Sequence, residues 1–111
     1  MMRLIILLSS LFAPSVFAAE AIEAIGAEKC GRGAKAYTVE FLAPDNAQVE
    51  AQGKVLVAGK EEPDKPSLSL DGKPCSNGRC AFLAKKGQTY KLTAESTAQA
   101  LNELCISVAR P

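Results

Sequence analysis

The stretch CSNGRC, residues 75–80, holds two of the chain's four cysteines on either side of a turn sequence. Asn77-Gly78 is the strongest two-residue signal for a β-hairpin, because both residues tolerate the positive φ of a type I′ turn. Such a turn places Cys75 opposite Cys80 at a non-hydrogen-bonded position, where Cα atoms lie about 4.5 Å apart. That separation falls within the range of disulfides. The spacing therefore predicts a Cys75–Cys80 bond that closes the loop.

The two remaining cysteines, Cys30 and Cys105, then have to pair with each other. Four cysteines allow three connectivities, and loop-closure entropy does not choose among them. It gives about 7 kcal/mol for this pairing and about 7.5 kcal/mol for Cys30–Cys75 with Cys80–Cys105. The turn geometry is what favours Cys30–Cys105, a bond that ties the start of the domain to its last strand.

Metal binding and redox chemistry are the competing interpretations of the cysteines. The chain has no histidine and no Cys-x-x-Cys pair, which are the usual components of a structural zinc site. Thioredoxin-like chemistry uses two residues between its cysteines, whereas four separate Cys75 from Cys80. We therefore expect structural disulfides, with no metal and no cofactor.

The N-terminal residues 1–18 have the pattern of a secretory signal peptide. Arg3 supplies the positive charge, an apolar run follows over 4–12, and a small-residue cleavage signal ends at Ala18. The apolar run is less than half of the about 20 residues that a membrane-spanning helix needs, and no cysteine follows the cleavage site directly for lipid attachment. We expect a single mature domain, residues 19–111, in the periplasm or outside the cell and without a membrane anchor.

The charges of the mature chain are balanced. Loss of Arg3 leaves 12 basic and 12 acidic residues, and neither kind forms a long run. This distribution argues against a nucleic-acid partner. Lys85, Lys86 and Lys91 are expected to protect an exposed strand edge from aggregation, with contact to an anionic surface as the alternative.

Alternation of apolar and polar residues predicts a β-rich body. In residues 35–43, Tyr37, Val39 and Phe41 share one face of a half-buried strand. Tyr37 and Tyr90 are expected in the core with their hydroxyls at the rim. Further strands are expected at 47–52, 54–58, 67–70, 80–84, 88–94 and 104–109. In the last of these, Leu104, Ile106 and Val108 lie on one side and Cys105 on the other.

The remaining segments are expected to be loops, apart from one helical turn. Residues 59–66 form a charged loop, and residues 20–33 show no clear pattern. A short helical turn is expected near 96–103, where Ser96 and Gln99 have the spacing of a capping box. Short strands separated by Gly, Pro and Asn turns favour a small antiparallel β-sandwich or barrel.

Residues 53–94 also resemble bacterial Ig-like and transthyretin-like modules. The resemblance rests on a strand, a Pro-containing loop, a short strand ending at Asp71-Gly72, and a hairpin with the pattern Lys-x-Gly-x-x-Tyr. It covers less than half of the mature chain and implies an all-β sandwich. Folds of this kind carry many functions, so the resemblance implies architecture alone.

The usual catalytic components are mostly absent. Without histidine the chain has no His-based triad or general base, and its isolated glycines do not form a phosphate loop. The densest carboxylate group is Glu61-Glu62 with Asp64, whose spacing suits a solvated loop better than a calcium site. We therefore expect that the protein is not an enzyme.

Recognition of another protein is the function that remains. A loop held by a disulfide loses little entropy on binding, and Arg79 is of a type enriched in binding hot spots. The candidate partner-binding loop is Ser76, Asn77, Gly78 and Arg79. In the simpler interpretation Arg79 is a solvated turn residue. The sequence predicts an exported, non-catalytic protein-binding module, such as an inhibitor or immunity protein, with an assembly subunit of the cell envelope as the alternative.

Overall fold

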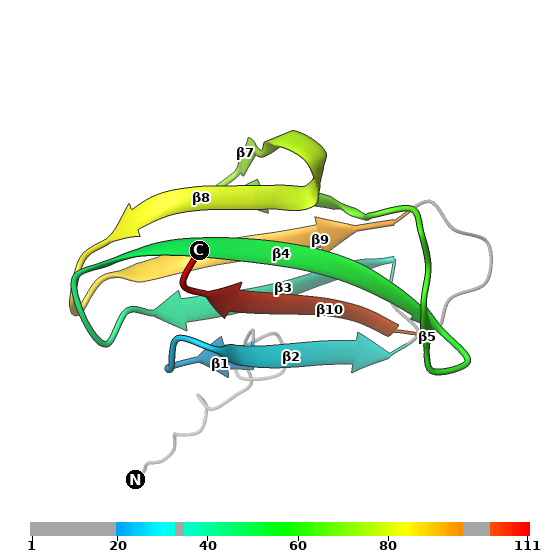
Figure 1. Cartoon of the computed structure of the whole chain (residues 1–111), viewed down its shortest axis with the longest axis horizontal. Coiled ribbons are helices and arrows are strands. Elements are labelled where there is room, and N and C mark those ends of the chain that lie inside the picture. The colour runs from blue at the N-terminus through cyan, green and yellow to red at the C-terminus, as the bar shows by residue number, and fades with distance from the viewer. Residues whose placement is uncertain (1–19, 33–34, 97–102) are drawn as a thin grey trace, which may run out of the picture.

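The computed structural model describes residues 20–32, 35–96 and 103–111, which form an all-β structure of two stacked sheets (Figure 1). The all-β class is therefore confirmed. The predicted signal peptide and the greater part of the predicted helical turn near 96–103 lie outside the described residues.

The first sheet, called sheet A, contains five strands. Their spatial order is β1 (Glu20–Ile22), β3 (Ala36–Leu42), β9 (Thr89–Glu95), β6 (Ser67–Leu70) and β7 (Lys73–Pro74). β1 is parallel to β3, and the other ladders among the described residues are antiparallel.

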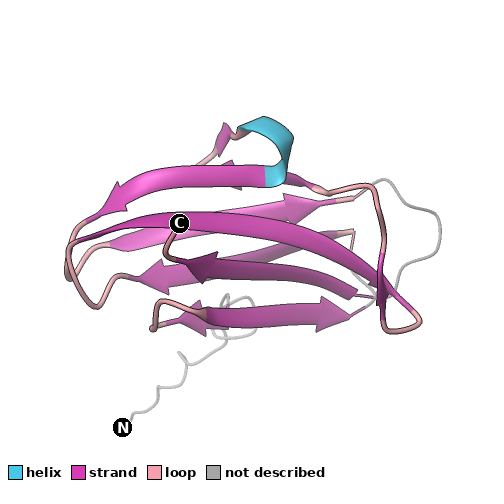
Figure 2. Cartoon of the chain, viewed as in Figure 1, coloured by secondary structure: helices cyan, strands magenta, loops and turns pink. Residues whose placement is uncertain are grey.

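The second sheet, called sheet B, is the front layer in Figure 1. Its order is β2 (Ala27–Arg32), β10 (Glu103–Ala109), β4 (Ala47–Val57) and β5 (Lys60–Glu61), and β8 (Arg79–Ala84) pairs with β4 on the side opposite β10. A single short 3-10 segment among the described residues, η3 (Ser76–Gly78), connects β7 to β8 (Figure 2).

The hydrophobic core lies between the two sheets, where the alternation of each strand places its apolar residues. The predicted inner faces of β3 and β10 are confirmed, because Val39, Phe41 and the three apolar residues of β10 are buried. Each such side chain contributes about 1.5–3 kcal/mol when fully buried. The largest members of this core are Ile22, Val39, Phe41, Val49, Leu68, Leu92, Leu104, Ile106 and Val108.

Both tyrosines lie at the rim of the core, as predicted. The Tyr37 ring is half-buried, and its hydroxyl donates to Glu20 Oε1 at 2.7 Å. Burial and this carboxylate raise the pKa of Tyr37 well above its ordinary value. The Tyr90 ring contacts Phe82 at a centroid distance of 4.9 Å, and its hydroxyl donates to Gln88 at 3.2 Å.

Strand β4 differs from the prediction, because it is one strand of eleven residues where two were expected at 47–52 and 54–58. Gly53 was expected to separate them, but it lies buried in the middle of the strand. A Cβ at this position would come within 3.0 Å of Pro66 Cγ. Gly53 therefore makes room for Pro66 and does not interrupt the strand.

The segments without a clear sequence pattern also contain strands. Residues 20–33 supply β1 and β2, and the charged loop predicted at 59–66 begins with β5. The pattern of β2 is weak because Lys29 takes a position on its inner face, in register with Ile106, and still remains exposed. An inward-pointing charge is tolerated on an edge strand, where it discourages pairing with other chains.

The hairpin between β4 and β5 turns through Ala58-Gly59. Their φ values are 54° and 80°, the sign pattern of a type I′ turn. A left-handed conformation costs an L-residue roughly 1–2 kcal/mol, whereas asparagine adopts it more readily. We expect Ala58→Asn to raise the free energy of unfolding by about 0.5–1 kcal/mol, measured by urea denaturation. Ala24→Asn, at an exposed site without positive φ, is the control; an equal gain there would contradict the turn argument.

Gly31 in β2 faces the ring of Tyr37, and a Cβ at Gly31 would overlap the ring carbons. We expect Gly31→Ala to lower the free energy of unfolding by about 1–3 kcal/mol, the usual cost of overpacking. Tyr37→Leu in the same chain should remove part of that cost, since the two positions are in contact. Strictly additive effects in a urea-denaturation cycle would show that the ring is not the obstacle.

Candidate functional site

The two disulfides join the pairs predicted from the sequence, Cys75–Cys80 and Cys30–Cys105. Cys30 and Cys105 face each other directly in the ladder between β2 and β10, with a Cα–Cα distance of 4.0 Å. Disulfides of this kind are typical of oxidising compartments. Among the described residues no cysteine is free.

The loop closed by Cys75–Cys80 is a corner between the sheets, and the predicted hairpin across it is wrong. β7 pairs with β6 in sheet A, whereas β8 pairs with β4 in sheet B. Cys75 therefore has no ladder partner in β8, and its Cα lies 5.2 Å from that of Cys80. Pro74 ends the short β7 strand, as its missing N–H leads one to expect.

The turn inside this corner nevertheless has the predicted conformation. Asn77 has φ 56° and ψ 34°, Gly78 has φ 68°, and the Arg79 N–H donates to the Ser76 carbonyl. Both central residues are thus left-handed, as in a type I′ turn. The Asn-Gly signal specifies the turn correctly, although the strands that flank it belong to different sheets.

Gly78 fixes the corner to the preceding loop. It is buried, and a Cβ there would lie 2.9 Å from the Pro66 carbonyl oxygen and 3.1 Å from Lys65 Cβ. Of the four predicted partner-binding residues, Gly78 is therefore turned inward. Ser76, Asn77 and Arg79 are exposed.

Arg79 lies on the outer face of sheet B and not at the tip of a loop. It is the first residue of β8, and its Nη1 is 3.6 Å from Glu50 Oε2. Gln52 Nε2 donates to the other oxygen of Glu50 at 3.0 Å. The Arg79 side chain still keeps 61% of its surface exposed, so it remains accessible to a partner.

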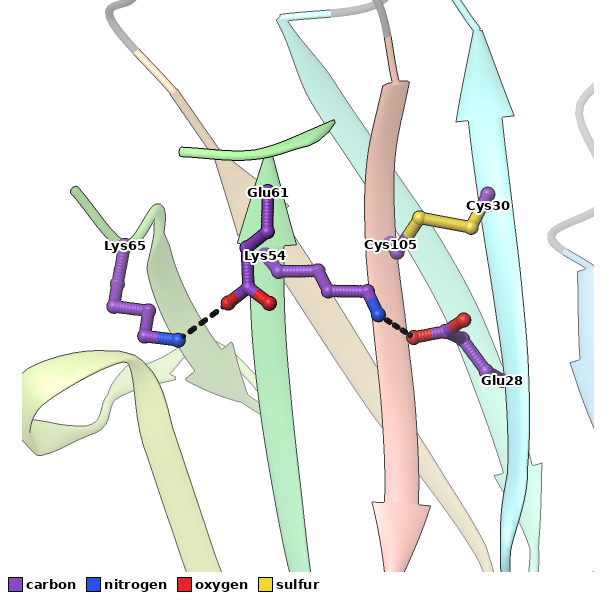
Figure 3. Close-up of polar contacts among 6 residues, drawn as sticks. All are labelled: Glu28, Cys30, Lys54, Glu61, Lys65 and Cys105. Atoms are coloured by element: carbon purple, nitrogen blue, oxygen red, sulfur yellow. Dashed lines mark hydrogen bonds and ion pairs between the residues drawn. A yellow bond between two sulfur atoms is a disulfide. The ribbon is translucent and has the colours of Figure 1, made fainter. Parts of the chain in front are cut away.

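Two depressions border the segment 65–67 that the corner packs against. A shallow groove of about 420 Å³ runs between this segment and the corner, and it is lined by Lys65, Pro66, Ser67, Cys75, Asn77 and Gly78. A second cavity of about 260 Å³ includes Glu62 and Asp64 from the predicted carboxylate group. Glu61 points elsewhere, toward the outer face of sheet B (Figure 3).

Charged side chains cross the outer face of sheet B in a line that the sequence analysis did not find (Figure 3). Lys54 Nζ reaches from β4 across β10 and lies 3.0 Å from Glu28 Oε2 on β2. Lys65 Nζ lies 2.8 Å from Glu61 Oε2. The bond to Glu28 raises the pKa of Lys54, and the bond from Lys65 lowers the pKa of Glu61.

Glu28, Cys30 and Cys105 are described residues whose three possible metal-ligand atoms all lie within 4.8 Å of one another. Both sulfurs belong to the same disulfide, so neither is a thiolate that could bind a metal. The remaining carboxylate already accepts a bond from Lys54. In this oxidised form the group is a structural crosslink beside an ion pair and does not suit a metal.

Comparison with known proteins does not identify the chain, since no family model, no curated protein and no solved structure matches it. In the described ranges no helix has the length and apolar character needed to cross a membrane.

The two disulfides should contribute unequally to stability, because they close loops of different length. Their sequence separations are 75 and 5 residues, for which chain entropy gives about 4.5 and about 2 kcal/mol. We expect the double variant Cys30→Ala/Cys105→Ala to lose roughly twice as much free energy of unfolding as Cys75→Ala/Cys80→Ala. Urea denaturation of both variants beside the oxidised protein measures this, and a larger loss in the second variant would contradict the entropic account.

Proposed function

We propose that the protein is a small exported, non-catalytic protein-binding module, such as an inhibitor or an immunity protein, and that the disulfide-closed corner contacts its partner. The observation that carries the proposal is the rigid presentation of Ser76, Asn77 and Arg79. The Cys75–Cys80 bond, the left-handed turn and the burial of Gly78 together fix the backbone that carries these three exposed side chains.

Preorganisation supports binding at this corner. A segment that is already fixed loses less conformational entropy when it meets a partner, so more of the contact energy becomes affinity. Arginine is also enriched among the residues that dominate binding energy. The groove of about 420 Å³ beside Asn77 and Gly78 offers room for a partner's side chain next to these polar groups.

The type of β-sandwich and the cellular location of the protein are also part of this proposal. We propose an Ig-like or transthyretin-like sandwich, supported by two stacked sheets and by the turn pattern of residues 53–94. The signal-peptide pattern of residues 1–18 together with two disulfides supports a periplasmic or extracellular location.

A second candidate function is that of an assembly subunit in the cell envelope. It is favoured by strand β8, which pairs with β4 on one side and with no other described strand on the other. An exposed strand edge is a template for pairing with another chain. In an assembly subunit this edge would meet a strand of a neighbouring subunit.

Site-specific photo-crosslinking in the native cells tests the corner. We expect a photoreactive residue at Asn77 to give an adduct of defined mass, and Arg79→Ala to reduce its yield several-fold because a charged contact is lost. The control site is Glu40, which is exposed on the outer face of sheet A. The proposal fails if Asn77 gives no adduct, or if Asn77 and Glu40 give the same one; mass spectrometry of the adducts reads the result.

A further inference from the structure

The edge strands of the two sheets differ in how well they are protected against pairing with other chains. β1, β5 and β7 contain three, two and two residues, and β7 ends in Pro74. β2 is longer but carries Glu28, Lys29 and Arg32. Short length, proline and charge are the usual means by which edge strands avoid pairing with other chains.

β8 has none of these protections over most of its length. It contains six residues, and the five from Cys80 to Ala84 are uncharged. Leu83, on its outward face, keeps 63% of its surface exposed, more than any other large apolar residue of the described chain. In Figure 1, β8 is the uppermost strand of the front sheet, beyond β4. The structure thus leaves one long, apolar edge open.

This edge is held rigidly at three points. Cys80 is bonded to Cys75 at one end. Phe82 packs against Tyr90 at 4.9 Å between ring centroids and against Phe41 at 6.4 Å. At the other end the Lys85 N–H donates to the Tyr90 hydroxyl at 2.9 Å. A strand fixed in this way loses little entropy when a further strand pairs with it.

Both ends of the open edge are basic. Arg79 begins β8, and Lys85 and Lys86 follow it in the turn to β9. Neither lysine side chain forms an ion pair with any part of the chain that the structure describes. Lys91, predicted to join them, lies apart on the outer face of sheet A in register with Glu40.

The basic residues at both ends of β8 determine which kind of strand can pair with its open edge. If two copies of the chain paired through β8 in antiparallel orientation, Lys85 and Lys86 of one copy would meet Arg79 of the other. In parallel orientation the lysines would meet each other. Like charges placed opposite one another across a ladder are destabilising, so pairing of two copies is disfavoured in either orientation. A strand with acidic residues at both ends is complementary.

We propose that the β8 edge binds an extended segment of a partner protein, with an uncharged alternating centre and acidic residues at both ends, as an added strand of sheet B. Main-chain hydrogen bonds supply affinity in this mode of recognition, and alternate side chains supply specificity. Binding at this edge rests on the protein-binding function proposed above, and it adds β8 as a second contact surface, separate from the Asn77 corner.

A synthetic peptide tests the proposal on the mature, oxidised protein. Its centre alternates valine and threonine over six residues, the length of β8, and a pair of glutamates stands at each end. The comparison peptide has the same centre with lysine pairs. By calorimetric titration we expect the glutamate peptide to bind at least about ten-fold more tightly, with an affinity that falls as salt is added. Amide shifts should concentrate in residues 79–84.

Charge reversal and edge blocking make the test specific. Lys85→Glu/Lys86→Glu should reverse the preference between the two peptides, and Leu83→Lys should weaken both by about ten-fold or more, because a lysine on the edge disfavours pairing. Lys91→Glu, on the other sheet, should change neither affinity. Circular dichroism of each variant verifies that it is folded.

Four results would overturn the proposal. Three come from the peptides: no binding of the glutamate peptide to the folded protein, equal binding of both peptides, and amide shifts outside β8. The fourth is a dimer, seen by sedimentation, that is lost in Leu83→Lys, which would favour a second copy as the occupant. None of these outcomes affects the crosslink expected at Asn77, so the two surfaces are tested separately.

Discussion

The structure depends on the small inward-facing residues of β4. Three of its five buried positions are Ala47, Ala51 and Gly53, and this strand lies at the centre of sheet B. The small residue at position 53 leaves volume for Pro66 of the loop before β6, whose Cγ would lie 3.0 Å from a Cβ at Gly53. Close packing of this kind requires large and small side chains to alternate across the interface. The same relation recurs in β2, where Gly31 makes room for Tyr37.

This complementarity between large and small residues explains which strands could be predicted from the sequence. Strands with bulky alternating residues, such as β3 and β10, have a signal of their own, and their inner faces were predicted correctly. β4 was divided at Gly53 because a glycine inside a strand lacks a packing reason until its neighbour Pro66 is known. β1 and β2 were missed because a short or charged edge strand has little alternation to detect. The local sequence pattern is sufficient to predict a strand whose own bulky residues are buried. A strand with small or charged residues can be recognised only when the residues that pack against it are known.

The candidate site shows the same division between local and long-range information. The left-handed turn at Asn77-Gly78 and the pairing of the cysteines follow from sequence-local chemistry and were predicted. The contacts of Arg79 with Glu50, and of Lys54 with Glu28, depend on the register between strands far apart in the chain. A single sequence does not specify that register. The position of Arg79 on a sheet, and not at a tip, could therefore not be foreseen.

The place of β10 within sheet B also bears on the order in which the protein can assemble. β10 comes after all other described strands in the sequence, yet it lies between β2 and β4 and carries Leu104, Ile106 and Val108 into the core. During synthesis from the N-terminus, sheet B remains split into two parts, with both facing edges open, until residues 103–109 emerge. The Cys30–Cys105 bond can form only after that step. Closure of sheet B is therefore a late event, because it requires the last of the described strands.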